Sequence, residues 1–302
     1  MAAPSEPSRF PFRRIAVAGL GLMGGSLALA LREAGFSGVL LGAGGSAGDL
    51  EQARSATGPR AGDGRPVFGA VHGALADLPL EDLDLVVLAI PPAGLESCFG
   101  ELAGRISARC LVTDLASVKG PACAAGRRLL GARHLGSHPL VGSERHGFAA
   151  ASAALYRGSR CVLTPVAGTG PHPGLAPLRQ FWEALGCGVL VMDPGEHDQA
   201  LAATSHLPHL LAFAYMAGLD AGDGLGELAG GGLRDFSRIA ASDPALWTDI
   251  LLQNRTAVRE RLHGFRGALD TLDALLGAGD GPGLRKTLAL GRATRQKFRF
   301  PQ

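Results

Sequence analysis

The chain has 302 residues, of which 46% are hydrophobic, and this length is enough for two domains with separate cores. Its 29 basic and 27 acidic residues leave a net charge of +2, which offers no electrostatic basis for binding nucleic acid. Five cysteines without a C-x-x-C pair argue against a disulfide framework and a metal site, and favour reduced thiols in the cytoplasm.

The sequence predicts neither a signal peptide nor a membrane span. The first twelve residues contain three prolines and lack the apolar run of a signal peptide. The longest apolar stretch, 201–219, is interrupted by Ser205, His206, Pro208 and His209. Such polar groups predict a buried functional helix that does not enter a membrane.

The first half of the chain alternates apolar strands with helices. We expect helices at 26–34 and 178–185, and a loop with a short helix in the Gly/Ala-rich segment 42–65. Strands are predicted at 14–18, 39–41, 84–90, 110–114, 161–164 and 189–192. Continuous apolar strands separated by helices are typical of an α/β fold with a doubly wound (Rossmann-like) parallel sheet. In such a sheet the ligand lies at the carboxyl ends of the strands.

The pattern becomes entirely helical after Asp193. This residue, followed by Pro194, has the composition of a helix start. Further helices are predicted at 201–219, 247–262 and 265–276. We therefore divide the chain into a dinucleotide-binding domain, 1–193, and an all-helical substrate and dimerisation domain, 194–302.

A glycine-rich turn follows the first predicted strand and opens the first predicted helix. Gly19, Gly21 and Gly24 form the pattern G-x-G-x-x-G in the context required for dinucleotide binding. Gly19 permits the tight turn, Gly21 lets the pyrophosphate approach the backbone, and Gly24 permits close packing of helix on strand. The turn also contains Leu22 and Met23, so the free N–H groups of this helix start are expected to bind the cofactor.

The second predicted strand ends without the acidic residue that commonly holds the ribose 2′-hydroxyl. Gly44 occupies that position, so no carboxylate repels a 2′-phosphate there. No arginine attracts a 2′-phosphate either, although Ser46 could hydrogen-bond it. We expect NAD as the cofactor, and NADP stays open as an alternative.

A histidine and a carboxylate occur together in the stretch His138-Pro-Leu-Val-Gly-Ser-Glu144. This stretch follows a strand-like run and is expected to be a Gly/Pro-rich loop. An imidazole with an ordinary pKa of about 6.5 can accept a proton near neutrality. Combined with the nucleotide loop, it predicts an oxidation at a hydroxyl group, in which the cofactor takes the hydride and His138 the proton.

Five motifs occur in an order and at separations that resemble the prephenate/arogenate dehydrogenase family, over about residues 14 to 262. They are Gly21-Leu-Met-Gly-Gly-Ser26, Asp114-Leu-Ala-Ser-Val-Lys-Gly120, His138-Pro-Leu-Val-Gly-Ser-Glu144, Ser205-His-Leu-Pro-His209 and Gly231-Gly-Leu-Arg-Asp-Phe-Ser-Arg238. The resemblance implies oxidative decarboxylation of prephenate or arogenate with NAD(P), a step of tyrosine synthesis. It also implies a homodimer. The choice between the two substrates stays open.

The same resemblance implies roles for individual residues. His138 matches the catalytic histidine, and Ser117 matches the serine that orients its imidazole. Arg238 matches the arginine that binds the ring carboxylate, for which a guanidinium fork is suited. Ser205 and His209 lie four residues apart on one helix face and are expected to face the substrate. Further substrate contacts are expected from Ser143, Glu144, Arg234 and Trp247.

Two other functions remain as alternatives. A generic 3-hydroxyacid dehydrogenase would use a lysine in the second half of the chain, where none occurs before Lys286. A non-catalytic dinucleotide-binding regulatory homologue would be expected to have lost His138 or Arg238, and both are present.

Overall fold

The computed structural model describes residues 9–58, 64–142, 145–166, 171–219 and 225–298. The chain divides into two compact units. The first comprises Met1–Asp198 and Ala241–Gln253, and the second comprises Gln199–Ala240 and Asn254–Gln302. Each unit is described by itself below.

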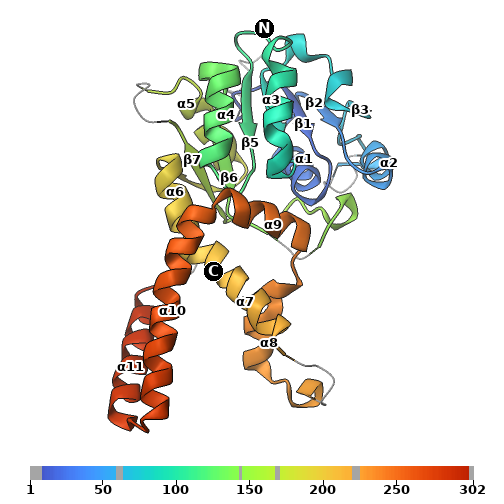
Figure 1. The fold of residues 1–302 in the computed structure, drawn as a ribbon. Helices are drawn as coiled ribbons and strands as arrows, with labels where there is room; N and C mark the ends of the chain where they lie inside the picture. The colour runs from blue at the N-terminus through green and yellow to red at the C-terminus, as the bar shows by residue number, and fades with distance from the viewer. Residues whose placement is uncertain (1–8, 59–63, 143–144, 167–170, 220–224, 299–302) are drawn as a thin grey trace. The chain divides into compact units, whose positions relative to one another are not determined.

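The first unit is built on a five-stranded sheet whose strand order is β3-β2-β1-β4-β5 (Figure 1). Its strands are β1 (Arg14–Ala18), β2 (Val39–Ala43), β3 (Ala70–His72), β4 (Leu85–Leu88) and β5 (Leu111–Asp114). Every neighbouring pair is parallel. The predicted doubly wound sheet is therefore confirmed.

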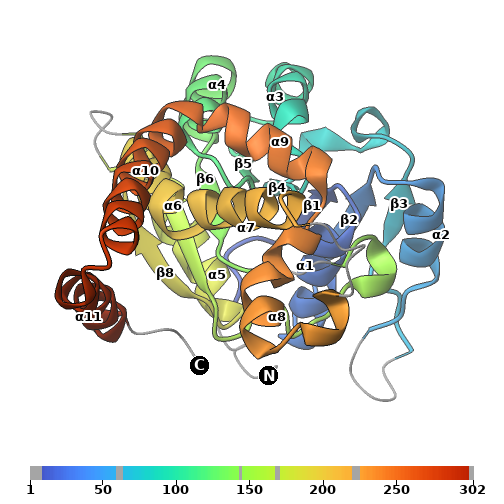
Figure 2. The ribbon, with the colours of Figure 1, turned by 60° about the horizontal axis from the view of Figure 1, so that its bottom comes forward.

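Helices cover both faces of this sheet (Figure 2). α1 (Leu22–Glu33) and α5 (Leu175–Ala184) lie on one face, and α3 (Leu95–Ala103) and α4 (Gly120–Leu130) lie on the other. The alternation of side chains along each strand supplies both cores. In β1, for example, Ile15 packs with the first pair of helices, and Ala16 packs with the second pair.

A second, three-stranded sheet contains β6 (Gly136–Pro139), β7 (Arg160–Thr164) and β8 (Gly188–Val191). β7 and β8 are parallel, whereas β6 runs antiparallel to β7 and places His138 opposite Val162. The expectation that His138 lies in a loop was therefore wrong. Glycine, histidine and proline have low strand propensity, and this strand forms by pairing with the apolar β7, a contact that local sequence does not encode.

Three further helices belong wholly or largely to the first unit. They are α2 (Ala47–Ser55), α6 (Pro194–Leu201) and α9 (Pro244–Gln253). The predicted start of α6 is confirmed, and the Asp193 carboxylate accepts the N–H of Gly195 at 2.7 Å. In the part of the chain that the structure describes, no helix combines the length and apolar character needed to cross a bilayer.

All the regular secondary-structure elements described in the second unit are helical, as predicted. It contains a π-helical turn (Ala202–His206), α7 (Leu207–Ala217), α8 (Gly231–Ser237), a 3-10 turn (Arg238–Ala241), α10 (Arg255–Gly277) and α11 (Gly281–Lys297). α10 and α11 lie side by side as a helical hairpin (Figure 1).

The predicted segment 247–262 is helical on both sides of Asn254, but the expectation of one continuous helix was wrong, because the chain breaks there between α9 and α10. Asn254 has φ −103° and ψ 24°, outside the helical region. Its side-chain amide lies 3.0 Å from Nδ1 of the buried His206. This contact forms only in the folded chain, between residues 48 positions apart. It favours the break at Asn254 although the sequence pattern on either side is helical. The predicted segment 265–276 continues α10.

Candidate functional site

The glycine turn between β1 and α1 has the geometry that its three glycines predict. Gly19 has φ +92°, and a Cβ at this position would collide with the carbonyl oxygen of Ala89. A Cβ at Gly24 would collide with the carbonyl oxygen of Gly19. A Cβ at Gly21 would meet nothing within 4 Å, so the backbone there is open to a ligand.

The helix that follows this turn offers N–H groups to an anion. α1 begins at Leu22, its N-cap residue Gly21 supplies no side-chain cap, and its first turn contains no acidic residue. The N–H groups at Leu22 and Met23 are thus at a helix start that favours negative charge. These residues fit the pyrophosphate of a dinucleotide.

The end of β2 determines what a bound ribose would meet. Gly44 has φ +69°, and the nearest atom to a Cβ built on it is 3.9 Å away. The Ser46 hydroxyl lies 2.7 Å from the Asp49 carboxylate and accepts the N–H of Asp49 at 3.1 Å. Burial opposes the charge on Asp49, but hydrogen bonds from the Phe148 N–H and from Ser46 hold its pKa below the ordinary value. Ser46 is therefore part of a capping box at the start of α2.

His138 lies near the carboxyl end of β6, in the first unit's second sheet, and is almost fully buried. Its Nδ1 lies 2.8 Å from Nε2 of His197, which is completely buried. Nδ1 of His197 lies 2.8 Å from Oδ1 of Asp198. The three side chains thus form a continuous hydrogen-bonded row that ends on a carboxylate.

His197 and Asp198 were not predicted as site residues. They lie in α6, directly after the helix start that the sequence revealed. A histidine and an acid side by side just after an apolar strand were the available signal. What the sequence could not supply is the distance to β6, which is set by the fold.

Ser117 lies in the loop between β5 and α4 and is half-buried. Within the described residues, its hydroxyl makes no hydrogen bond to His138, and the Nδ1 nitrogen of that imidazole is held by His197. The orienting role of Ser117 stays a prediction.

A buried ionic cluster supports β6 from the side of β5. The Lys119 ammonium pairs with the Asp114 carboxylate and donates to the carbonyl oxygen of Ser137 at 2.7 Å. The other carboxylate oxygen of Asp114 lies 3.0 Å from Nε2 of His134. Burial opposes the charge of Asp114, but Lys119 and then His134 outweigh it and hold the pKa of this carboxyl well below its ordinary value. The cluster fixes the strand that carries His138.

In the second unit, His209 and Arg238 lie close enough to interact electrostatically. Nδ1 of His209 donates to the carbonyl oxygen of Ser205 at 2.9 Å. Burial lowers the pKa of His209, the hydrogen bond to Ser205 opposes this, and the positive charge of Arg238 lowers it further. His209 is therefore neutral near pH 7. The helix is irregular just before Pro208, in the π-helical turn Ala202–His206, where the N–H of Leu207 reaches back five residues to the carbonyl oxygen of Ala202.

The remaining predicted residues lie in different surroundings. Arg234 and Asp235 are highly exposed and form a surface pair at 3.5 Å. Trp247 is half-buried in α9 of the first unit. Ser143 and Glu144 lie outside the described residues.

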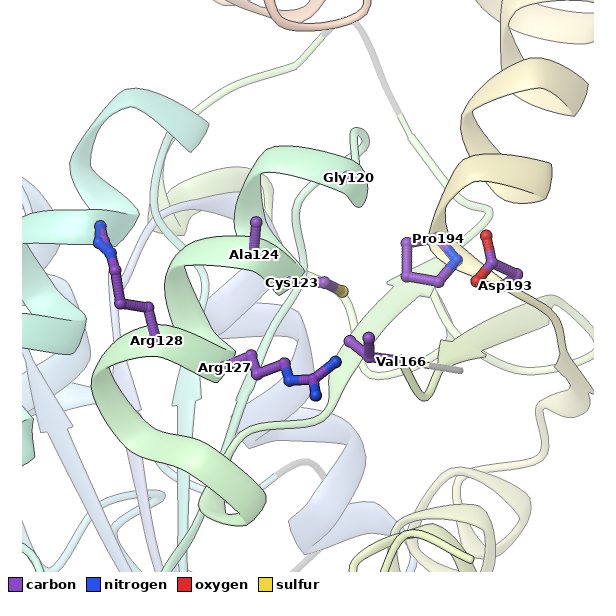
Figure 3. A pocket seen from close by; sticks show the side chains of 8 residues that line it. All are labelled: Gly120, Cys123, Ala124, Arg127, Arg128, Val166, Asp193 and Pro194. Atoms are coloured by element: carbon purple, nitrogen blue, oxygen red, sulfur yellow. The ribbon is translucent and has the colours of Figure 1, made fainter. Parts of the chain in front are cut away.

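A cavity of about 630 Å³ lies beside the start of α4. In Figure 3, Arg127 extends towards Val166 and Pro194, whereas Arg128 lies farther along α4 and pairs with Glu96. The lining residues are Gly120, Cys123, Ala124, Arg127, Arg128, Val166, Asp193 and Pro194. None of the predicted site residues lines this cavity, so it is separate from the predicted site.

Comparison with known proteins matches the chain to two family models. Residues 27–191 match "Prephenate dehydrogenase, nucleotide-binding domain" and residues 193–290 match "Prephenate dehydrogenase, dimerization domain". A cyclohexadienyl dehydrogenase of Zymomonas mobilis is 32% identical over 210 residues, which cover 67% of this chain and 71% of that protein.

Two solved structures extend the similarity over nearly the whole chain. Prephenate dehydrogenase from A. aeolicus in complex with hydroxyphenyl propionate and NAD+ has a TM-score of 0.85 and 30% identity, covering 94% of this chain and 98% of that chain. Synechocystis arogenate dehydrogenase has a TM-score of 0.77 and 31% identity, covering 95% of this chain and 100% of that chain.

Proposed function

Because this chain belongs to the prephenate dehydrogenase family, we propose that it catalyses the oxidative decarboxylation of prephenate or arogenate in tyrosine synthesis, with His138 as the general base. The substrate is a cyclohexadiene with a 4-hydroxyl, a ring carboxylate and a side-chain acid. The hydroxyl loses its proton to His138 as C4 is oxidised. The resulting dienone loses carbon dioxide and becomes aromatic, which makes the step strongly favourable.

The observation that carries this proposal is the position of His138 in the structure. The imidazole is almost fully buried, and its Nδ1 is engaged by His197 at 2.8 Å. Its Nε2 is then the nitrogen that can receive the hydroxyl proton. A base held in this way needs little reorganisation during the reaction. Ser117, in the loop beside the carboxyl end of β5, is proposed to orient the imidazole and the hydroxyl.

NAD is the cofactor, and the glycine turn of the first unit supplies its binding site. Gly19, Gly21 and Gly24 permit the approach of the pyrophosphate, and Leu22 and Met23 provide the helix start beside it. When bound, the nicotinamide accepts the hydride from C4. NADP is the alternative, because Gly44 carries no carboxylate to exclude a 2′-phosphate.

Substrate binding is proposed for the second unit and its neighbours in the sequence. Arg238 binds the ring carboxylate through its guanidinium fork, and the neutral His209 contributes a hydrogen-bond acceptor beside it. Ser205 lies one turn before His209. Additional substrate contacts are proposed for Ser143, Glu144, Arg234 and Trp247.

We also propose that the chain acts as a homodimer in the cytoplasm. Nucleotide binding is assigned to 1–193, and substrate binding and dimerisation to 194–302. Residues 193–290 match a dimerization domain, and the α10–α11 hairpin exposes the large apolar side chains Leu269, Leu276, Leu288 and Leu290. The five cysteines are all free thiols, which suits a reducing compartment.

A four-way assay tests the proposal. The protein is incubated with prephenate or arogenate and with NAD or NADP, while the formation of reduced nicotinamide is followed. We expect turnover of at least one substrate with NAD, accompanied by release of carbon dioxide. A simple 3-hydroxyacid serves as the control substrate. Failure to oxidise either cyclohexadiene, or preferential oxidation of the hydroxyacid, would refute the proposal.

A further inference from the structure

We propose that His197 and Asp198 are positioning residues that set the protonation of His138, so that the base always presents an unprotonated Nε2 to the substrate. This role rests on the proposed function of His138 and extends it to two residues that act through His138. In the row His138–His197–Asp198, the atoms that can donate and those that can accept a hydrogen bond determine this protonation.

The Asp198 carboxylate is surrounded by hydrogen-bond donors. Oδ1 accepts the N–H of Lys119 at 2.8 Å, and Oδ2 accepts the N–H of Gly120 at 2.8 Å. Both N–H groups belong to the start of α4, where the helix dipole favours an anion. A backbone N–H can only donate, so both side-chain oxygens of Asp198 act as acceptors here.

The carboxylate then determines the tautomer of each imidazole in turn. Because Oδ1 of Asp198 accepts, Nδ1 of His197 carries a hydrogen. In the neutral imidazole of His197, Nε2 is therefore an acceptor. Nδ1 of His138, at 2.8 Å, must donate to it, which leaves the lone pair of His138 on Nε2.

The row also stabilises the charge that the reaction creates. When the substrate O–H bond breaks, its proton forms a bond to Nε2 of His138, and the ring becomes an imidazolium. Its Nδ1–H continues to donate to His197, whose own Nδ1–H donates to Asp198. Because the side chains are buried, the carboxylate acts on this charge with little screening by water.

The surroundings contain other groups that bear on the charge of this row. The Lys119 ammonium is already paired with Asp114, which also contacts His134. The Cys161 thiol lies on β7 beside the main chain of His138, and burial holds its pKa well above the ordinary value, so it is neutral. Among the described residues, Asp198 is the carboxylate that contacts the row directly, and its removal is expected to matter most.

Two substitutions at His197 separate positioning from mere packing. In His197→Leu the imidazole of His138 loses its acceptor, and we expect kcat to fall by about 10²- to 10⁴-fold, the cost of a wrong tautomer in comparable sites. KM for substrate and cofactor should change by less than about 3-fold, since neither is contacted. In His197→Gln the side-chain amide can accept from His138 and donate to Asp198, so kcat should recover to within about 10-fold of wild type.

The matched control is His172→Gln, which replaces a half-buried histidine of the same unit outside the row. Nε2 of His172 donates to the carbonyl oxygen of His134 at 2.9 Å, and its Nδ1 accepts the N–H of Gly174 at 3.1 Å. His172 thus has the opposite tautomer to that proposed for His138. It provides an internal reference in a ¹⁵N spectrum of the histidine side chains, and its substitution should leave kcat unchanged.

The spectroscopic and kinetic results together decide the proposal. In the wild type, the His138 signal, identified by its loss in His138→Asn, should be that of an Nδ1–H tautomer, and it should shift towards Nε2–H in His197→Leu. The acid limb of the kcat/KM profile should move to lower pH in His197→Leu, because the imidazolium loses its carboxylate. In a His138→Asn background, His197→Leu should cause no further loss.

An unchanged His138 tautomer, or an unchanged kcat in His197→Leu, would overturn the role of His197 and Asp198. That outcome is distinct from failure of the proposed function, which would appear as full turnover in His138→Asn. If His197→Leu does not fold, His197→Gln still tests the row, because loss of kcat there with the Nδ1–H tautomer retained would contradict positioning.

Discussion

The side-chain ammonium of Lys119 donates to the carbonyl oxygen of Ser137 at 2.7 Å, and Ser137 directly precedes His138 in β6. The same ammonium pairs with Asp114 at the end of β5. One buried cation therefore links the last strand of the parallel sheet to the short strand that carries the proposed base. The position of His138 depends on this link as much as on its own hydrogen bonds.

Replacing Lys119 with methionine should destabilise the protein strongly. Asp114 would remain buried without its cation, and breaking such a pair costs about 3–5 kcal/mol of the free energy of unfolding. Denaturant unfolding at pH 7 measures the loss. Lys286→Met is the matched control, because Lys286 is exposed on α11 and should change stability by less than about 0.5 kcal/mol. An equal effect of the two substitutions would contradict the role of the buried pair.

The same pair gives the wild-type protein a specific acid sensitivity. The pKa of Asp114 is lower in the folded state than its ordinary value of 3.8, so the stabilisation from the Lys119–Asp114 pair is complete above that pH. It is lost as the pH falls from about 4 towards the lower pKa of the folded state. In Lys119→Met the buried carboxylate favours protonation, so the stability gap between variant and wild type should narrow as the pH falls from 7 to 4. A gap that widens over this range would contradict the assignment.

His138→Asn should abolish most turnover without affecting the cofactor. The amide cannot accept the hydroxyl proton, and loss of a positioned general base typically costs about 10²- to 10⁴-fold in kcat. Binding of NAD, measured by fluorescence titration, should be unchanged, because the glycine turn lies elsewhere in the first unit. A variant that keeps near-normal kcat would remove His138 from the mechanism.

Arg238→Gln should raise KM for the substrate while leaving KM for NAD within about 2-fold. Loss of a charge-assisted bidentate contact costs about 1.5–3 kcal/mol, equivalent to roughly 10- to 150-fold in KM. Arg292→Gln is the control, because Arg292 is exposed on α11 and has no proposed contact with the substrate. An unchanged KM in Arg238→Gln, or an equal rise of KM in both variants, would contradict the binding of the ring carboxylate by Arg238.

Gly44→Asp should shift the cofactor preference towards NAD. The new carboxylate would accept the ribose 2′-hydroxyl and repel a 2′-phosphate, and a Cβ at this position has room. Gly44 has φ +69°, which aspartate and asparagine tolerate better than most residues. Gly44→Asn therefore controls for backbone strain at nearly equal size. The measurement is the ratio of kcat/KM for NAD to kcat/KM for NADP. Equal ratios in Gly44→Asp and Gly44→Asn would mean that a negative charge at this position does not affect the cofactor preference.

The parts of the fold that the sequence predicts are those in which local pattern and tertiary contact agree. β4 is apolar along its whole length and β1 is apolar from Ile15 onward. In the turn after β1, a Cβ at Gly19 or Gly24 would collide with a backbone carbonyl oxygen. β6 and the break at Asn254 were missed because partners distant in the sequence create them. His197 was missed for the same reason, because the contact that singles it out is made with Nδ1 of His138, 59 residues earlier in the chain.

The π-helical turn at Ala202–His206 holds one residue more than the α-helical path between its flanking helices would need. The turn therefore behaves as a single-residue insertion between α6 and α7. Deleting one residue here would let the two helices join without interruption, yet every side chain beyond the deletion would rotate by about 100° about the axis. The extra residue of the turn therefore sets the rotation of α7 about its own axis. This rotation determines the direction in which the His209 side chain points.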